Sequence, residues 1–339
     1  MNSFLEIDRP YVIAEIGGNH EGDMDFARKL LLDAAEAGAD AVKFQAYSPD
    51  KIVNKLQDPE RHQHFGKFTL SLEQYRELAE MCVEVEVDFM ASVWDMGAFR
   101  FLDPLIAVHK IGSGDLTNYR LLKPMAETGK PICIATAMAD MEEVLAAVAF
   151  VRDVNPAIVE SGGLCVMHCV AMYGDPRDEY ANLAAIDALA AALPPQVVVG
   201  YSDHTLGNVA VKVAVERGAR VIETHFTDDN SRDFRDHHFA HTKEELNDFV
   251  VYLRRRQEML GRAVKVPVFE VETSDRIAEF RRAVYLRRDC LAGTVVSEDL
   301  LTTLRPLRGI SASEYFKVVG KVASRDLVAY EPLDWGDFK

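Results

Sequence analysis

The chain has 339 residues, of which 48% are hydrophobic and 27% charged, and its formal net charge is -16. This composition is ordinary for a soluble globular protein, and the length predicts one large domain with or without a small second one. The negative charge argues against a nucleic acid or an anionic membrane as partner, because both require a basic face. A pocket with a few lysines can still bind a small anion.

No apolar run reaches the length needed to span a membrane, and the first residues lack the basic start and apolar core of a signal peptide. The five cysteines form no CxxC pair, and four of them lie in apolar segments. We therefore expect reduced core cysteines and a cytoplasmic protein.

Eight short, nearly continuous apolar runs follow one another along the chain, with helical patterns between them. Such runs are typical of strands buried on both faces, and several of the helical stretches end in Gly or Gly-Ala, a helix C-terminal signal. Eight strand–helix units predict an α/β fold of the (β/α)8 TIM-barrel type. The runs begin at Tyr11, Ala41, Val87, Ala107, Pro131, Leu164, Val197 and Arg220.

An open, doubly wound sheet is the alternative architecture. It normally has a GxGxxG turn after its first strand, whereas this chain has GGNHEGD at residues 17–23. The pattern therefore favours the barrel.

The character of the sequence changes near residue 262. We expect residues 1–262 to form the barrel, 263–279 a linker, and 280–339 a small β-rich domain in which short strands alternate with turns. A domain of about 60 residues is marginal alone, so we expect it to lean on a larger surface.

Polar residues interrupt or close the predicted strands at the end where such barrels build their active sites. His204 and His225 end consecutive strands, so their imidazoles are expected to meet across the mouth. Two neutral imidazoles with water suit Mn²⁺, Zn²⁺ or Fe²⁺ and make an open site that polarises a carbonyl; two ordinary polar strand ends are the alternative. The other strand-end residues include Glu15, Gln45, Ser92, Ser113, Asp115, Thr136, His168, Tyr173, Ser202 and Glu223.

Lys43 and Lys110 lie within apolar strands, where a lysine is costly unless it is paired or reaches solvent. One interpretation is a structural ion pair. A second is an anion clamp, in which the two ammoniums and the hydroxyls of Ser92, Ser113 and Ser202 surround a phosphate or carboxylate. A third is a Schiff-base lysine, which would make the protein a class I aldolase.

Several segments, taken in order, resemble the sialic acid synthase family, that is, the N-acetylneuraminate synthases and their legionaminate and pseudaminate relatives. The tail, with GTVVSEDLLTTLRP (293–306) and GISASEYFKVVGK (309–321), resembles that family's antifreeze-like (SAF) domain. The barrel segments are AEIGGNHEGD (14–23), GADAVKFQAY (38–47), KIGSGDLTN (110–118), GYSDHTLG (200–207), VIETHFT (221–227) and RDHH (235–238).

Members of this family condense phosphoenolpyruvate with an open-chain N-acyl amino sugar aldehyde to give a nine-carbon 3-deoxy-2-ulosonic acid and phosphate. The resemblance therefore implies a transferase that uses a divalent metal, Mn²⁺ first, with Mg²⁺ or Co²⁺ as alternatives. It also implies a homodimer in which the antifreeze-like domain of one subunit caps the barrel of the other.

The resemblance also implies a role for each matching residue. It assigns His204 and His225 to the metal, and Lys43, Ser92, Lys110, Ser113 and Ser202 to phosphoenolpyruvate. Glu15, Gln45 and Asp115 fall at the reacting centre, Asp236 and Tyr173 face the sugar, and Arg305 of the capping domain reaches the N-acyl group.

This chain departs from the family pattern mainly on the sugar side. It has Ala135 where relatives have Ser, Thr224 where they often have Lys, and SRDFRDHHFAHT (231–242) in place of a turn with Pro and Gly. The identity of the aldehyde is therefore open. The alternatives are a synthase or aldolase of the same barrel type for another sugar, and a relative that binds sugar without turnover.

Overall fold

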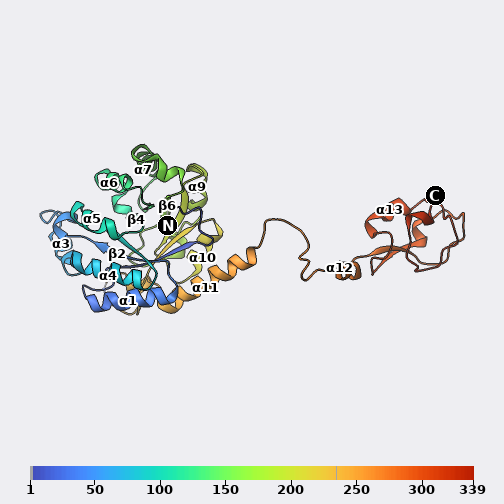
Figure 1. Cartoon of the computed structure of the whole chain (residues 1–339), viewed down its shortest axis with the longest axis horizontal. Coiled ribbons are helices and arrows are strands. Elements are labelled where there is room, and N and C mark those ends of the chain that lie inside the picture. The colour runs from blue at the N-terminus through green and yellow to red at the C-terminus, as the bar shows by residue number, and fades with distance from the viewer. Residues whose placement is uncertain (1–2, 234) are drawn as a thin grey trace. The chain divides into compact units, whose positions relative to one another are not determined.

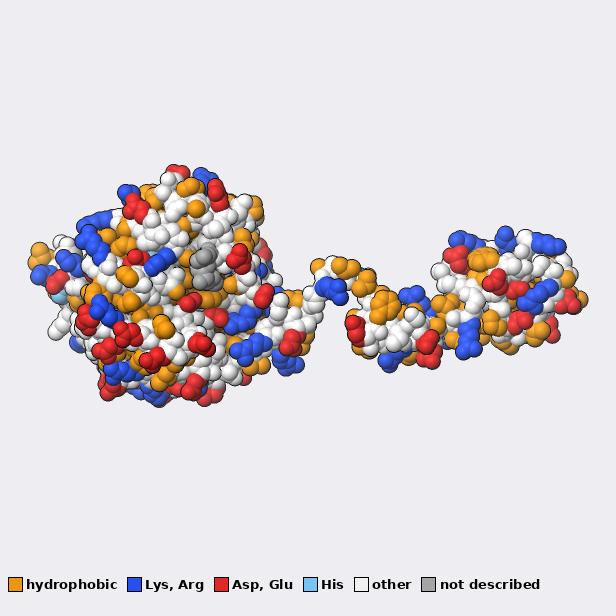
Figure 2. Space-filling view, in the orientation of Figure 1, with side chains coloured by type: hydrophobic (Ala, Val, Ile, Leu, Met, Phe, Trp, Pro, Cys, Tyr) orange, Lys and Arg blue, Asp and Glu red, His pale blue; other side chains and the backbone are white. Residues whose placement is uncertain are grey.

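The computed structural model describes residues 3–233 and 235–339 of the chain (Figure 1). The chain forms two compact units, Met1–Gly261 and Arg262–Lys339. No helix among the described residues is long and apolar enough to cross a membrane. On the face visible in Figure 2, acidic side chains lie among basic ones on both units.

The first unit is a closed barrel of eight parallel strands in sequence order, in which the last strand pairs with the first. Helices surround the strands (Figure 1), and burial on both faces explains why the strands read as apolar runs. The predicted TIM barrel is confirmed. The strands are β1 (Tyr11–Gly17), β2 (Ala41–Ala46), β3 (Asp88–Val93), β4 (His109–Ile111), β5 (Ile132–Ala135), β6 (Leu164–Cys169), β7 (Val198–Asp203) and β8 (Val221–His225).

The helices begin and end where local chemistry favours it. Asp23 caps α1 (Met24–Ala37) by accepting a hydrogen bond from Phe26 N, and Gly38 ends it with φ of 94°, which glycine adopts without strain. Capping boxes begin three later helices. The other helices of this unit are α2 (Pro49–Ile52), α3 (Pro59–Gly66), α4 (Leu72–Glu84), α5 (Met96–Leu102), α6 (Tyr119–Glu127), α7 (Met141–Val154), α8 (Pro156–Glu160), α9 (Ala185–Ala192), α10 (Val209–Glu216) and α11 (Lys243–Leu260).

The barrel interior changes character along the strands. Ile13 and Ala41 belong to an apolar cluster at the amino ends. Two residues later on the same strands come Glu15 and Lys43, which are neighbours in the register of β1 with β2. Because side chains alternate along a strand, residues two apart face the same side, so the inward face turns from apolar to charged. The charged end is the carboxyl end of the barrel.

The second unit is a small β domain with its own apolar core. Its strands β9 (Ala283–Leu286) and β10 (Leu301–Leu304) pair antiparallel, and a short helix α13 (Tyr315–Val318) follows. Helix α12 (Ser274–Phe280) lies within the segment that the sequence predicted to be a linker.

Candidate active site

Four charged side chains meet in the barrel interior, although burial makes each of them costly alone. Lys43 Nζ lies 2.6 Å from Glu15 Oε2 and 3.6 Å from Glu223 Oε2. Lys110 Nζ lies 3.4 Å from Glu223 Oε1. All four side chains are at least 94% buried. Two cations and two anions therefore offset one another in a region that excludes water.

The pKa values of this group follow from burial and from the neighbouring charges. Burial raises the pKa of Glu15 above its usual value, against the opposing effect of Lys43. Burial acts to lower the pKa of Lys43, but Glu15 and Glu223 outweigh it and the pKa is raised. For Glu223 the two lysines outweigh burial, and its pKa is lowered. Lys43 is thus a protonated ammonium, which disfavours the Schiff-base interpretation because that chemistry needs a neutral amine.

Hydrogen bonds extend the charged group to three of the other predicted residues. Gln45 Nε2 donates to Glu15 Oε1 at 2.7 Å. Lys43 Nζ donates to Ser92 Oγ at 3.2 Å, and Ser202 Oγ donates to Glu223 Oε1 at 3.0 Å. Six of the side chains that the resemblance assigned to phosphoenolpyruvate and to the reacting centre therefore form one network with Glu223: Glu15, Lys43, Gln45, Ser92, Lys110 and Ser202.

His204 and His225 lie beside this network at the ends of β7 and β8. Their ring centroids are 5.1 Å apart. His204 Nε2 and His225 Nδ1 are buried and have no hydrogen-bond partner among the described residues. Burial lowers the pKa of both imidazoles, to about 4 for His204, so the rings are neutral near pH 7.

A divalent metal fits this histidine pair. Neutral imidazoles with an unbonded ring nitrogen are the form in which histidine binds a metal. Asp236 Oδ2 lies 3.6 Å from His225 Nδ1. In the part of the chain that the structure describes, no three His, Cys, Asp or Glu side chains are grouped to hold a metal. A metal held by His204 and His225 alone would have positions open to water or substrate.

Two aromatic rings lie against the histidines. Tyr173 lies with its ring centroid 4.7 Å from that of His204, and Phe239 lies 4.9 Å from His225. Tyr173 is 56% exposed. It therefore contacts the histidine pair and is open to solvent, and its role toward the sugar stays a prediction.

Three predicted residues stand apart from the network. Ser113 Oγ accepts a hydrogen bond from Ala137 N at 3.0 Å, and Asp115 Oδ1 accepts one from Asn118 at 2.8 Å, both in the loop after β4. Burial raises the pKa of Asp115. Arg305 belongs to the second unit, where its guanidinium packs over the ring of Phe280 at 5.6 Å. Their roles toward substrate stay predictions.

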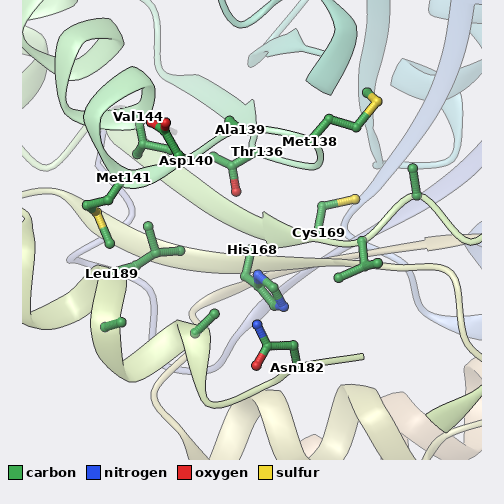
Figure 3. Close-up of a pocket in the computed structure, with 14 residues that line it drawn as sticks. Thr136, Met138, Ala139, Asp140, Met141, Val144, His168, Cys169, Asn182 and Leu189 are labelled. Atoms are coloured by element: carbon green, nitrogen blue, oxygen red, sulfur yellow. The ribbon is translucent and has the colours of Figure 1, made fainter. Parts of the chain in front are cut away.

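A cavity of about 470 Å³ (Figure 3) lies near the histidine pair, although neither histidine lines it. It lies between α7 and α9 at the ends of β5 and β6, and most of its lining is apolar. Cys169 lines it, and the sulfur of Cys169 lies 3.5 Å from His204 Nδ1. Thr136 and His168 supply polar groups, and Figure 3 shows them on opposite sides of the cavity.

The sequence analysis gave no role to two residues that the structure brings to the centre. Glu223 joins Lys43 to Lys110, and its inward position follows from the alternation Val221, Glu223, His225. Arg235 lies in the loop after β8, and its Nη2 donates to Gln45 Oε1 at a distance of 3.3 Å. A sequence pattern could have indicated Glu223, but none indicates the distance between Arg235 and Gln45.

The model of the NeuB family matches residues 30–265, and that of the SAF domain matches residues 281–339. The chain belongs to the NeuB family. The resemblance seen in the sequence motifs is thereby confirmed.

Curated relatives match along nearly the whole chain. An N,N'-diacetyllegionaminic acid synthase of Legionella pneumophila is 36% identical over 96% of this chain and 93% of its own. The human N-acetylneuraminate-9-phosphate synthase is 32% identical over 92% and 88%. Among solved structures, the Bacillus subtilis spore coat polysaccharide biosynthesis protein SpsE is 32% identical and covers 98% of this chain and 95% of its own, with a TM-score of 0.66.

Proposed function

We propose that this chain condenses phosphoenolpyruvate with an open-chain N-acyl amino sugar aldehyde and water, giving a nonulosonic acid and phosphate. The observation that carries the proposal is the buried Lys43–Glu15 network set beside two neutral imidazoles with unbonded ring nitrogens. The names of the relatives, which include legionaminic and pseudaminic acid synthases, agree with the proposal.

Lys43 and Lys110, with Ser92, Ser113 and Ser202, hold phosphoenolpyruvate. Each lysine is held by a buried carboxylate, so the two ammoniums are fixed before the substrate arrives. Preorganised cations of this kind stabilise an anion without reorganising at the moment of reaction.

His204 and His225 hold the metal, which we propose to be Mn²⁺. When bound, it supplies a Lewis acid for the aldehyde oxygen of the sugar. We assign Asp236 and Tyr173 to the sugar; the 3.6 Å between Asp236 Oδ2 and His225 Nδ1 and the contact of Tyr173 with His204 support this assignment.

The reaction forms a C–C bond from C3 of phosphoenolpyruvate to the aldehyde carbon, which leaves a cation at C2. Water adds to C2, and phosphate departs with the bridging oxygen. Glu15 has a raised pKa and an oxygen anchored by Gln45, so it is suited to accept or return the proton of that water. Asp115, whose pKa burial also raises, is the second candidate for proton transfer.

The test is release of phosphate from phosphoenolpyruvate with a panel of 2-acetamido sugars, with and without Mn²⁺, Mg²⁺ or Co²⁺. With heavy oxygen in the C–O–P bridge, the label should leave in the phosphate. Label retained in the ulosonic acid would refute C–O cleavage. No phosphate release with any sugar and metal would refute the synthase proposal.

We further propose that the chain acts as a cytoplasmic homodimer in which Arg305 reaches the sugar in the partner's barrel. Five free thiols agree with a reducing compartment. Arg305→Ala should raise the KM for the sugar far more than that for phosphoenolpyruvate. Mixing Arg305→Ala with Glu15→Ala subunits should restore some activity, since a hybrid dimer regains one intact site. No recovery after verified subunit exchange would contradict the swapped arrangement.

A further inference from the structure

Arg235 is a guanidinium at the mouth of the barrel, and the described residues give it no acidic partner. Its Nη2 donates to Gln45 Oε1 at 3.3 Å, and its Nη1 lies 3.4 Å from His64 Nε2. Its Nε is buried and has no hydrogen-bond partner among the residues that the structure describes. No carboxylate in the described part of the chain forms an ion pair with it. Since a guanidinium has five donors, several of them remain available to a ligand.

Arg232, in the same loop, is a structural arginine and provides a comparison for Arg235. Its Nε donates to Asp228 at 3.0 Å and its Nη1 to Glu21 at 3.2 Å, while its guanidinium packs over Phe26 at 4.3 Å. Arg235 has the aromatic contacts, over Phe65 at 5.9 Å and over Phe68 at 5.3 Å, without the carboxylates. Its side chain is therefore positioned but not neutralised.

Two further features favour an anion at this place. A β-carbon at position 18 would lie 2.5 Å from Arg235 Nε, so Gly18 leaves the space that the guanidinium occupies. Arg61 and Lys67 add positive charge nearby and Asp236 adds one negative charge, since all three, with Arg235, act on His64. A local basic area on a chain of net charge -16 is the arrangement by which a few cations attract a small anion.

The anion that fits here belongs to the sugar rather than to phosphoenolpyruvate. Phosphoenolpyruvate already has Lys43 and Lys110 in the proposed site. Arg235 directly precedes Asp236, the residue proposed to bind the sugar hydroxyls. It also donates to Oε1 of Gln45, the side chain whose Nε2 donates to Glu15. In the proposed site, its remaining donors would lie beside the acceptor sugar and away from the reacting carbon.

Resting on the proposed function, we propose that Arg235 determines acceptor specificity. It selects an N-acyl amino sugar aldehyde that carries an anionic group, a phosphate ester or a carboxylate, away from the aldehyde. A guanidinium binds either group through paired hydrogen bonds.

The experiment compares three acceptors at saturating phosphoenolpyruvate: a neutral 2-acetamido-hexose, its 6-phosphate and its 6-carboxylate. The wild type should favour the better of the two anionic acceptors over the neutral one by about 10- to 100-fold in kcat/KM, the range expected for a hydrogen-bonded charged group. The 6-phosphate and 6-carboxylate arms tell which anion is bound.

Arg235→Met keeps an unbranched apolar side chain but removes the charge and the guanidinium that lies over Phe65 and Phe68. It should abolish the preference, mainly by raising the KM of the anionic acceptor. Arg235→Lys should keep part of it, which separates loss of charge from loss of the loop's structure. Arg232→Met is the matched control and should leave the preference ratio unchanged.

Three results would overturn the proposal: equal or better use of the neutral acceptor by the wild type, an unchanged preference in Arg235→Met, or a raised KM for phosphoenolpyruvate with every acceptor in Arg235→Met. If only the neutral sugar releases phosphate, the synthase proposal stands and this one fails. If no sugar releases phosphate, both fail.

Discussion

At the amino ends of the strands the barrel is filled by residues such as Ile13 and Ala41, whereas two residues further along it holds Glu15 and Lys43. The backbone and the inward face are the same in both regions. We call the amino end of the barrel its base. Each apolar side chain buried there stabilises the fold, by about 25 cal/mol per Å² of surface removed from water. The mouth buries charged side chains. Their mutual attraction offsets the cost of removing them from water but adds little net stability. The base therefore supplies stability, whereas the charged side chains of the mouth serve the chemistry of the site.

The largest effect should come from breaking the charge balance of the mouth. Lys43→Met leaves Glu15 and Glu223 without their shared cation, and removing one partner of a buried pair costs about 3–5 kcal/mol. We expect this loss in urea unfolding, together with loss of phosphate release.

The double variant Lys43→Met, Glu15→Gln should recover part of the stability and none of the activity. If the stability losses of Lys43→Met and Glu15→Gln simply add in the double variant, the two side chains are not coupled. The mouth would then not be held by balanced charges.

Removing a metal ligand should separate activity from stability within the mouth. His204→Ala should lower phosphate release about 10³-fold or more, because a Lewis acid supplies several kcal/mol of transition-state stabilisation. It should cost less stability than Lys43→Met, since His204 Nε2 makes no hydrogen bond within the described chain.

His168→Ala is the matched control on β6. His168 Nε2 bonds to Ala181 O at 2.8 Å, so its loss should lower stability and leave metal retention intact. Full metal-dependent activity in His204→Ala would show that the assignment of the ligand is mistaken.

The mouth should also be sensitive to acid. Burial lowers the pKa of His20 to about 4, and Gly22 N donates to its Nδ1 at 3.0 Å, so folding favours the neutral ring. The unfolded chain, with a His pKa of about 6.5, binds more protons between the two values. Stability should therefore fall as pH drops from about 6.5 to 4, by up to about 3 kcal/mol from this residue.

His20→Asn keeps an acceptor for Gly22 N and removes the titration. Its stability should vary less with pH than that of the wild type across this window, as measured by urea unfolding at several pH values. Parallel pH curves for the two proteins would rule out the assignment to His20.

The smallest effect should come from the base. Ile13→Val should cost about 1 kcal/mol and leave both KM values unchanged, because a methylene is lost from a packed core that substrate does not contact. Glu15→Gln, two residues along the same strand, should instead lose activity. A changed KM in Ile13→Val would mean that the base and the mouth are not separable.

Much of this arrangement was predictable because strand periodicity is local. The apolar runs predicted eight strands, and the polar residues at their ends included Glu15, Lys43, His204 and His225. The role of Glu223 was missed, because its position between two lysines depends on how strands far apart in sequence face one another across the closed barrel. Helix α12 was missed because a seven-residue helix gives a weak periodic signal.

The sequence by itself determined which residues point inward and at which end of the barrel they lie, since both follow from a two-residue period and from the direction of each strand. It also determined the family, because the family motifs are short contiguous segments of sequence. Only the tertiary structure decided which side chains meet. Arg235 lies against Gly18 and Gln45 because closure of the barrel brings the loop after β8 beside β1 and β2. Such distances depend on the whole fold, so no local pattern contains them.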